Sequence, residues 1–283
     1  MAAPCTEQPG SLEALPDNRC LYDLAAHCLA TRSVACKLAW TEQVHAAWQR
    51  GDLHREATTS VEPIADPGRP QRPRLVASRD VPHRKLGTVV GRAALVHAVV
   101  HIEFNAIQLA WDAVYRFRDM PAAYYHDWVQ VARDEVRHFR LLSQRLAELG
   151  YAYGDFDAHH GLWEMAVKTA ASCRLRMALV PRVLEARGLD VTPGMITRLH
   201  TVGDMTTAAI LRLILDEEVA HVAAGSRWFR FTCEREGLQP ETTFRALLSE
   251  YFPGGLKGPF NLDARRQAGF TDKELAQLGS GPT

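Results

Sequence analysis

The chain has 283 residues, and its 33 lysines and arginines balance its 33 aspartates and glutamates, giving a formal net charge of zero. This length allows one large domain or two small ones, with a sizeable core. The charge balance argues against a protein whose main role is to bind nucleic acid or an anionic membrane.

Targeting and membrane signals are also missing from the sequence. The N-terminal "MAAPCTEQPG" has no basic stretch followed by an apolar run, so no signal peptide is expected. No uncharged apolar run approaches the roughly 20 residues that a membrane span needs. The six cysteines form no Cys-x-x-Cys pair and suit a reducing compartment. We therefore expect a cytoplasmic protein without a membrane partner.

The chain before residue 85 has the character of an accessory region. Helical periodicity covers the stretch that ends near Trp48, where Leu21, Leu24, Cys28 and Leu29 can share one face. The following "VEPIADPGRPQRPRLVASRDVPHRK" is rich in proline and arginine, which predicts an extended segment. Two interpretations stay open for it: a strap across the surface of the protein, or a solvated linker.

Four long helices are predicted between residues 87 and 237. The first follows Gly87, the second begins after Pro121 and stops at Gly150, and the fourth is capped by Asp204. The third is expected from Leu162 to Gly188, with a kink or break at Pro181. "LDVTPG" is predicted as a turn before a short helix at residues 195–202, and two short helices are expected near the C-terminus, the second with a Thr271–Glu274 capping box.

No segment shows the alternation of a strand, so the predicted fold class is all-α. It consists of an N-terminal region (residues 1–84), a four-helix bundle (85–237) and a C-terminal extension (238–283) that packs on the bundle.

Two segments repeat the motif Glu-x-x-His inside apolar helices. "RDEVRHF" supplies Glu135 and His138, and "DEEVAHV" supplies Glu218 and His221. Residues three apart on a helix lie on one face, so each pair can bind a common ligand. A single such pair is usually a solvated surface pair. Two in amphipathic bundle helices indicate a metal site.

The other two helices each offer one carboxylate in an apolar setting, Glu103 in "HIEFNAI" and Glu185 in "PRVLEARG". Glu103 precedes Glu135 by 32 residues, and Glu185 precedes Glu218 by 33. One Glu from each of two helices and one Glu-x-x-His from each of the others is the ligand set of dinuclear iron or manganese bundles. The alternative is a structural bundle with ion pairs, in which burying four carboxylates without a cation would be costly.

An acid precedes each motif, Asp134 before Glu135 and Glu217 before Glu218. Metal-bound imidazoles usually donate their second N–H to a carboxylate. Asp134 and Glu217 are therefore candidates to hold the histidine of the opposing helix, and exposure to solvent is the alternative. The pair His97 and His101, one turn apart, is interpreted as packed bundle histidines and not as a second metal site.

Several long strings, in order, resemble a bacterial ferritin-like family known as domain of unknown function 455. These strings are "PGRPQRPRLV", "HIEFNAI", "DEVRHFRLL", "LVPRVLEARGLDVTPGM", "DEEVAHVAAGSRWF" and "GPFNLDARRQAGF". The resemblance implies a ferritin-like bundle with two metal ions, bound by the same six residues. A more distant relative by architecture is the tRNA 2-methylthio-isopentenyladenosine hydroxylase, an oxygen-activating di-iron protein.

Two positions depart from what such proteins lead us to expect. Ala171 and Ser172 stand where a polar His-Asp-like pair is expected, which puts a proton-handling role of that turn in doubt. Leu142 stands where a radical-forming tyrosine would follow the histidine by one turn. The sequence therefore does not favour a radical-generating ribonucleotide reductase subunit.

The functional hypothesis is a protein with two Fe ions, or Mn or a mixed Fe/Mn pair, that activates O2 or peroxide to oxidise or hydroxylate an unidentified substrate. The substrate could be a small molecule or a modified RNA base, and the electron donor is unknown. The alternatives are a metal-handling or peroxide-scavenging protein without an organic substrate, and a structural bundle with a vestigial site. The sequence leaves the oligomeric state open, a homodimer included.

Overall fold

The structure, a computed structural model, describes residues 19–57 and 59–279. Over these residues it is all-α, as predicted, with no strand and two isolated backbone bridges. The chain forms two compact units, Met1–Trp163 and Glu164–Thr283, and each is described by itself. The division into three parts at residues 84 and 237 stays a prediction.

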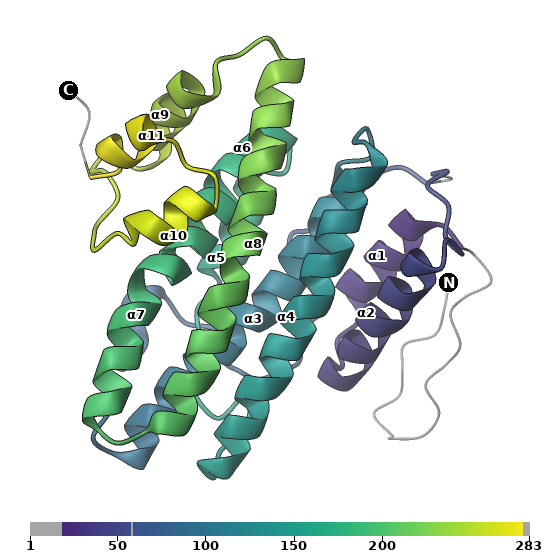
Figure 1. Ribbon diagram of the computed structural model, residues 1–283. Helices are drawn as coiled ribbons and strands as arrows, with labels where there is room; N and C mark the ends of the chain where they lie inside the picture. The colour runs from purple at the N-terminus through teal and green to yellow at the C-terminus, as the bar shows by residue number, and fades with distance from the viewer. Residues whose placement is uncertain (1–18, 58, 280–283) are drawn as a thin grey trace. The chain divides into compact units, whose positions relative to one another are not determined.

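The first unit is built around a pair of long helices (Figure 1). Helix α3 packs along α4, while α1 packs on α3 and α2 packs on α4. The helices are α1 (Leu21–Ala30), α2 (Val34–Gln49), α3 (Val89–Arg116) and α4 (Ala122–Glu148), with the short 3-10 helix η1 (Ser78–Asp80) before α3.

The predicted ends of the long pair are confirmed. Thr88 caps α3 by accepting a hydrogen bond from the backbone N–H of Gly91, and Pro121 caps α4 from a φ of −67°. Gly150, just after α4, has a φ of 84°, a left-handed conformation that glycine adopts without strain. The short connection between α3 and α4 makes them an antiparallel hairpin.

A buried lysine joins α1 to α2. Lys37 is fully buried, and its ammonium donates to the carbonyl oxygens of Cys28 and Leu29 at the end of α1. Those carbonyls have no partner within their own helix, so Lys37 acts as their cap. Burial lowers the pKa of Lys37 to about 7. The cysteines of the described segments are free, and no disulfide supplements these contacts.

The proline- and arginine-rich segment is a strap, not a solvated linker. Leu75 and Ala158 form a backbone bridge, and Arg74 forms an ion pair of 2.6 Å with Asp157. At the other end, the N–H of Gly68 donates to Leu29 O across 2.7 Å, and a Cβ at Gly68 would collide with the backbone of Ala30. A glycine is required for this close approach.

The strap and the loop after α4 cover the face of α3 that carries His97 and His101. The N–H of Gly154 donates to His97 Nε2 across 3.0 Å, while Tyr153 Oη lies 2.9 Å from His101 Nδ1 and His159 O lies 3.1 Å from His101 Nε2. A carbonyl can only accept, so His101 carries its proton on Nε2. These are satisfied histidines, as the sequence interpretation held.

The second unit contains a hairpin whose first arm is broken. Segments η2 and α7 pack along α8, and three short helices cover them (Figure 1). The elements are α5 (Gly161–Lys168, which begins in the first unit), α6 (Cys173–Leu179), the π-helical η2 (Val180–Glu185), α7 (Ala186–Thr201), α8 (Met205–Arg235), α9 (Pro240–Tyr251), α10 (Leu262–Gln267) and α11 (Asp272–Gln277).

The prediction for the third helix was wrong in two places. The helix breaks after Lys168, where Ser172 caps α6, and it does not end at Gly188 but runs on through Pro193 to Thr201. Proline 193 cannot donate to Leu189 O, its usual partner four residues back. That oxygen accepts instead from Asn261 Nδ2 at 3.2 Å. The helix therefore survives its proline because a distant residue supplies the missing donor.

Two capping predictions for this unit are confirmed. Asp204 caps α8, and Thr271 with Glu274 forms the capping box of α11. The kink or break expected at Pro181 takes another form. The helix widens there into the single π-helical turn η2, which absorbs the missing N–H. Helix α10 was not predicted.

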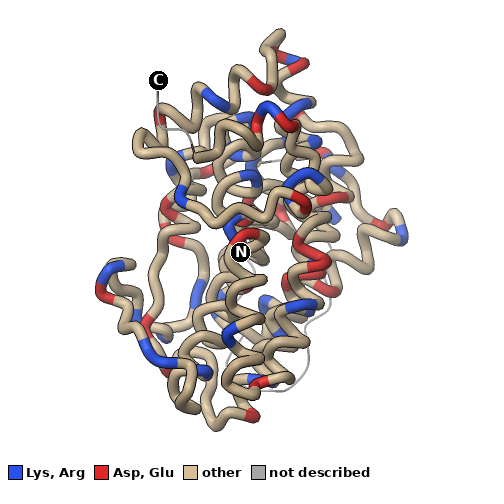
Figure 2. The backbone as a smooth tube through the Cα atoms, turned by 60° about the vertical axis from the view of Figure 1, so that its left-hand side comes forward, with Lys and Arg blue, Asp and Glu red and all other residues tan. Residues whose placement is uncertain are grey.

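The distribution of charges along the chain and the hydropathy of helix α3 are both consistent with a buried apolar core. Figure 2 shows basic and acidic positions interspersed along the chain, consistent with its net charge of zero. Helix α3 is long and apolar enough to cross a membrane by length and composition alone, but 72% of its most apolar window is buried inside the protein. The core helix of a protein without membrane spans has the same property.

The histidine face of α3 predicts a pH dependence of stability. Burial lowers the pKa of both His97 and His101 to about 4, from 6.5. Their contribution to stability is thus complete above pH 6.5 and is lost as the pH falls towards 4. For each histidine the loss is at most about 1.4 kcal/mol per pH unit.

Replacing His97 by Gln keeps an acceptor for Gly154 and removes the titration. We expect His97→Gln to lose less stability than the wild type between about pH 7 and about pH 5, as measured by urea unfolding. Equal losses in the two proteins would contradict the assignment.

The contact between η2 and α8 predicts a steric effect. A Cβ on Gly225 of α8 would lie 2.4 Å from Cβ and Cγ of Pro181. We expect Gly225→Ala to destabilise the protein by about 1–3 kcal/mol, because the packed helices must separate. The control is Gly188→Ala, where a Cβ meets nothing within 4 Å. It should be neutral or stabilising by up to about 1 kcal/mol in thermal unfolding.

Candidate metal centre

Helix α3 carries Glu103 into an apolar interior. Its neighbours Phe104 and Ile107 are buried, and the glutamate itself is only 4% exposed. An ionised carboxylate in such surroundings is costly unless it is paired with a cation or takes up a proton.

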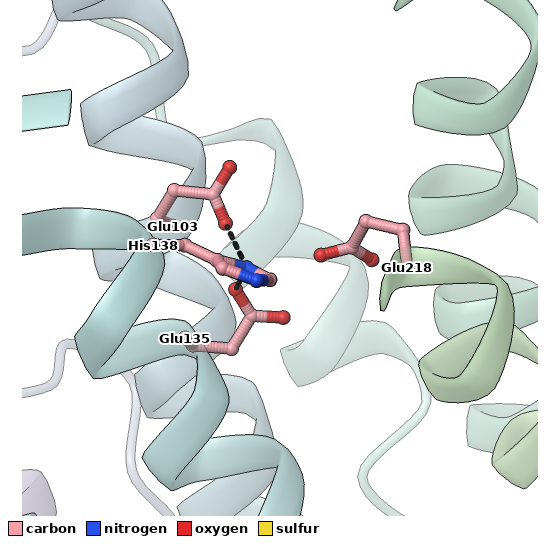
Figure 3. Close-up of side chains that lie close together, drawn as sticks. All are labelled: Glu103, Glu135, His138 and Glu218. Carbon is pink, nitrogen blue, oxygen red and sulfur yellow. Dashed lines mark hydrogen bonds and ion pairs between the residues drawn. The ribbon is translucent and has the colours of Figure 1, made fainter. Parts of the chain in front are cut away.

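Helix α4 places Glu135 and His138 opposite Glu103 (Figure 3). Both side chains are buried, and their spacing of three residues puts them on one face, as predicted. His138 Nδ1 lies 3.2 Å from Glu135 Oε2 and 3.6 Å from Glu103 Oε2. The α3–α4 hairpin therefore brings three of the predicted ligands together.

The electrostatics of this cluster favour a cation. Burial raises the pKa of Glu103 well above 4.5, and the nearby Glu135 raises it further, while His138 opposes the shift. Two buried carboxyl groups beside one imidazole cannot both stay ionised when nothing balances their charge. Either a proton or a positive ion must balance them.

The donor set fits a metal ion. Glu103, Glu135 and His138 each offer a ligand atom, and these atoms lie within 4.8 Å of one another. Two carboxylate oxygens and one imidazole nitrogen suit iron or manganese better than a thiolate-favouring zinc site. The cluster could hold a metal ion, whose identity the geometry does not specify.

Helix α8 of the second unit repeats the motif. His221 Nδ1 lies 3.3 Å from Glu218 Oε1, and the histidine is 3% exposed. Glu185 is half-buried and ends the π-helical turn η2. The full set of six ligands stays a prediction, because Glu185, Glu218 and His221 belong to the second unit and the other three belong to the first.

The two acids ahead of the motifs have different surroundings. Asp134 accepts hydrogen bonds from Gln130 Nε2 at 3.0 Å and from Arg133 at 3.3 Å, both on its own helix. Glu217 is half-buried on α8. Their predicted role as partners of a histidine on an opposing helix stays a prediction.

Sequence reasoning missed a buried ion pair next to Glu185. Arg182 is 1% exposed and lies 2.8 Å from Glu274 of α11, which is 6% exposed. The available signal was an arginine inside the apolar run "LVPRVL". Its partner, 92 residues further on, could not be inferred from local pattern.

Comparison with known proteins identifies the family of the chain. The family described as "Protein of unknown function (DUF455)" matches residues 30–276. The chain belongs to this family. The predicted resemblance is thereby confirmed.

A relative from Haemophilus influenzae, described as "Uncharacterized protein", is 48% identical over 213 residues, which cover 73% of this chain and 74% of that protein. No solved structure matches the chain. Membership of DUF455 therefore identifies the family of the chain but supplies no reaction.

The raised pKa of Glu103 predicts that metal binding releases a proton. The raised pKa favours the protonated form of the metal-free carboxyl, and a metal ion must displace that proton. Affinity should rise with pH by up to about tenfold per unit for each proton released. Calorimetric titration with Mn(II) in two buffers of different ionisation enthalpy measures the release.

The control for this titration is Glu103→Gln, which carries no titratable proton at that position. It should release fewer protons per bound ion. The same proton release in wild type and variant would show that Glu103 is already ionised.

Proposed function

We propose that this protein is a dinuclear iron or manganese protein that activates O2 or peroxide. The observation that carries the proposal is the burial of Glu103, Glu135 and His138, with ligand atoms within 4.8 Å of one another. The second unit repeats both the motif and its spacing. Together the two sets match the ligands of carboxylate bundles that bind two metals.

Each residue has a defined task in this proposal. Glu103, Glu135, Glu185 and Glu218 would hold the ions, and their charges would balance the cations. His138 and His221 would each supply one imidazole ligand. When bound, the metal pair supplies a place for O2 or peroxide and the electrons for its reduction.

The protein's own residues control protonation at the site. Without metal, burial and the nearby Glu135 favour a proton on the Glu103 carboxyl, which lowers the charge of the buried cluster. Glu103, Glu135 and His138 are themselves buried, and burial strengthens the attraction between carboxylates and cation.

The cysteine pattern favours an enzyme that receives its electrons from a separate donor. The cysteines of the described segments are free, and the sequence holds no Cys-x-x-Cys pair for a rubredoxin-like centre. We therefore propose a separate electron donor and a reducing, cytoplasmic location. The substrate is a small molecule or a modified RNA base.

Elemental analysis of purified protein tests the proposal. We expect about two Fe or Mn ions per chain in the wild type. Glu135→Ala should lose at least one of them, because it removes a buried ligand. The matched control is Glu148→Ala on the same helix, whose side chain is 45% exposed and pairs with Arg145. It should keep both ions.

Oxygen reactivity then separates the alternatives. Reduced, iron-loaded wild type mixed with O2 should consume O2 and show a transient absorbance that Glu135→Ala lacks. Peroxide turnover without consumption of an organic substrate would favour a scavenging protein. Protein that contains no metal and takes none up after anaerobic reconstitution would contradict the proposal and indicate a structural bundle.

A further inference from the structure

The C-terminal segment of the second unit grips the turn that carries Glu185. Three residues close to Glu185 make these contacts, one before it in the sequence and two after it. Arg182 pairs with Glu274, Arg187 donates to the carbonyls of Lys257 and Pro259 at 2.7 and 3.1 Å, and Asp190 binds Arg265 at 2.7 Å and the N–H of Asn261 at 3.0 Å. The C-terminal clamp is the name we give to the residues that make these contacts, Lys257, Pro259, Asn261, Arg265 and Glu274.

The first of these contacts is almost completely desolvated. The guanidinium carbon of Arg182 lies 4.0–4.8 Å from the ring centroids of three phenylalanines, Phe229, Phe244 and Phe270. Glu274 is held by its own capping box, in which its carboxylate accepts the N–H of Thr271 at 2.9 Å. Such a pair adds little net stability over an apolar replacement, but it fixes one geometry, because either charge alone would be buried without a counter-charge.

The turn between these contacts needs external support. Pro181 removes a helical hydrogen bond, and η2 is π-helical from Val180 to Glu185. Single π-helical turns inside α-helices are frequent at functional sites. Pro181 rests against Gly225 of α8 on one side, and the clamp holds Arg182 and Asp190 on the other. Figure 1 shows α10 beside α7 and α8.

We propose that the C-terminal clamp sets the orientation of the Glu185 carboxylate, with Arg182 and Glu274 as positioning residues for a metal ligand. The inference rests on the proposed function, because the orientation of Glu185 matters only if it binds metal. A clamp that merely covered the core would stabilise the unit without changing its affinity for metal. Partners that orient a ligand typically change metal affinity by about 10–100-fold.

The test compares Glu274→Gln with Asp272→Asn. The first removes the charge facing Arg182 and keeps the volume of the side chain. The second lies two residues away, where Asp272 is 83% exposed and pairs with Arg266. Chelator competition with Mn(II) gives the affinity for each ion, and the visible spectrum of the Co(II)-loaded protein reports ligand geometry.

We expect Glu274→Gln to bind one ion like the wild type and the other at least about tenfold more weakly, with an altered Co(II) spectrum. Asp272→Asn should match the wild type in both. Leu199→Ala, at a fully buried position of α7, controls for lost stability, since it should lower the unfolding temperature and leave the Co(II) spectrum unchanged.

The outcomes separate the inference from the proposed function. Wild type that takes up no metal overturns the proposed function and this inference with it. Wild type that binds two ions, with Glu274→Gln equal in affinity and spectrum, overturns the clamp alone.

A second variant decides the question if Glu274→Gln does not fold. Arg187→Gln removes the hydrogen bonds to Lys257 and Pro259 at a side chain that is 42% exposed. Arg187→Gln should bind one of the two ions more weakly and shift the Co(II) spectrum. An affinity and a spectrum equal to those of the wild type would overturn the inference.

Discussion

The structure depends on two buried carboxyl groups, Glu103 and Glu135, which α3 and α4 hold close to the single imidazole of His138. Apolar residues would pack between α3 and α4 at no electrostatic cost, whereas acids there must share a proton or a cation. The α3–α4 hairpin nevertheless holds the two acids together. His138 Nδ1 lies 3.2 Å from Glu135 Oε2 and 3.6 Å from Glu103 Oε2. A site that is unfavourable when empty and favourable with a divalent ion couples metal binding to the stability of the helices that form it.

Helix α3 carries Glu103 of this cluster, and it also carries His97 and His101, two buried imidazoles that need hydrogen-bond partners. The histidine face at His97 and His101 is closed by backbone and hydroxyl partners from the loop after α4, which leaves these imidazoles neutral. They have no basis for competing with His138 as ligands, because their lone pairs are already used. The loop after α4 thus satisfies polar groups that would otherwise be buried without partners on a long apolar helix.

The sequence predicted those parts of the fold that depend on local chemistry. The ends of α3 and α4, the Asp204 cap and the Thr271–Glu274 capping box each follow from a few adjacent residues. The cluster of Glu103, Glu135 and His138 was predictable because helix geometry fixes which residues share a face. The course of α7 was not, since Pro193 stays helical only because Asn261, far along the chain, donates to Leu189 O. Neither proline nor asparagine carries that information alone.

The same limit explains why Arg182 escaped prediction and why the two hairpins need different outer layers. The first arm of the α3–α4 hairpin is one continuous helix, so α1 on α3 and α2 on α4 need only cover the hairpin and bury their own apolar faces. The first arm of the second hairpin is interrupted at Ser172 and widened at Pro181, so its backbone does not fix the direction of Glu185. Directional contacts must then replace helical continuity, and a desolvated ion pair favours one geometry because either charge alone would be buried without a counter-charge. Arg182 with Glu274 and Asp190 with Arg265 provide them on both sides of the glutamate.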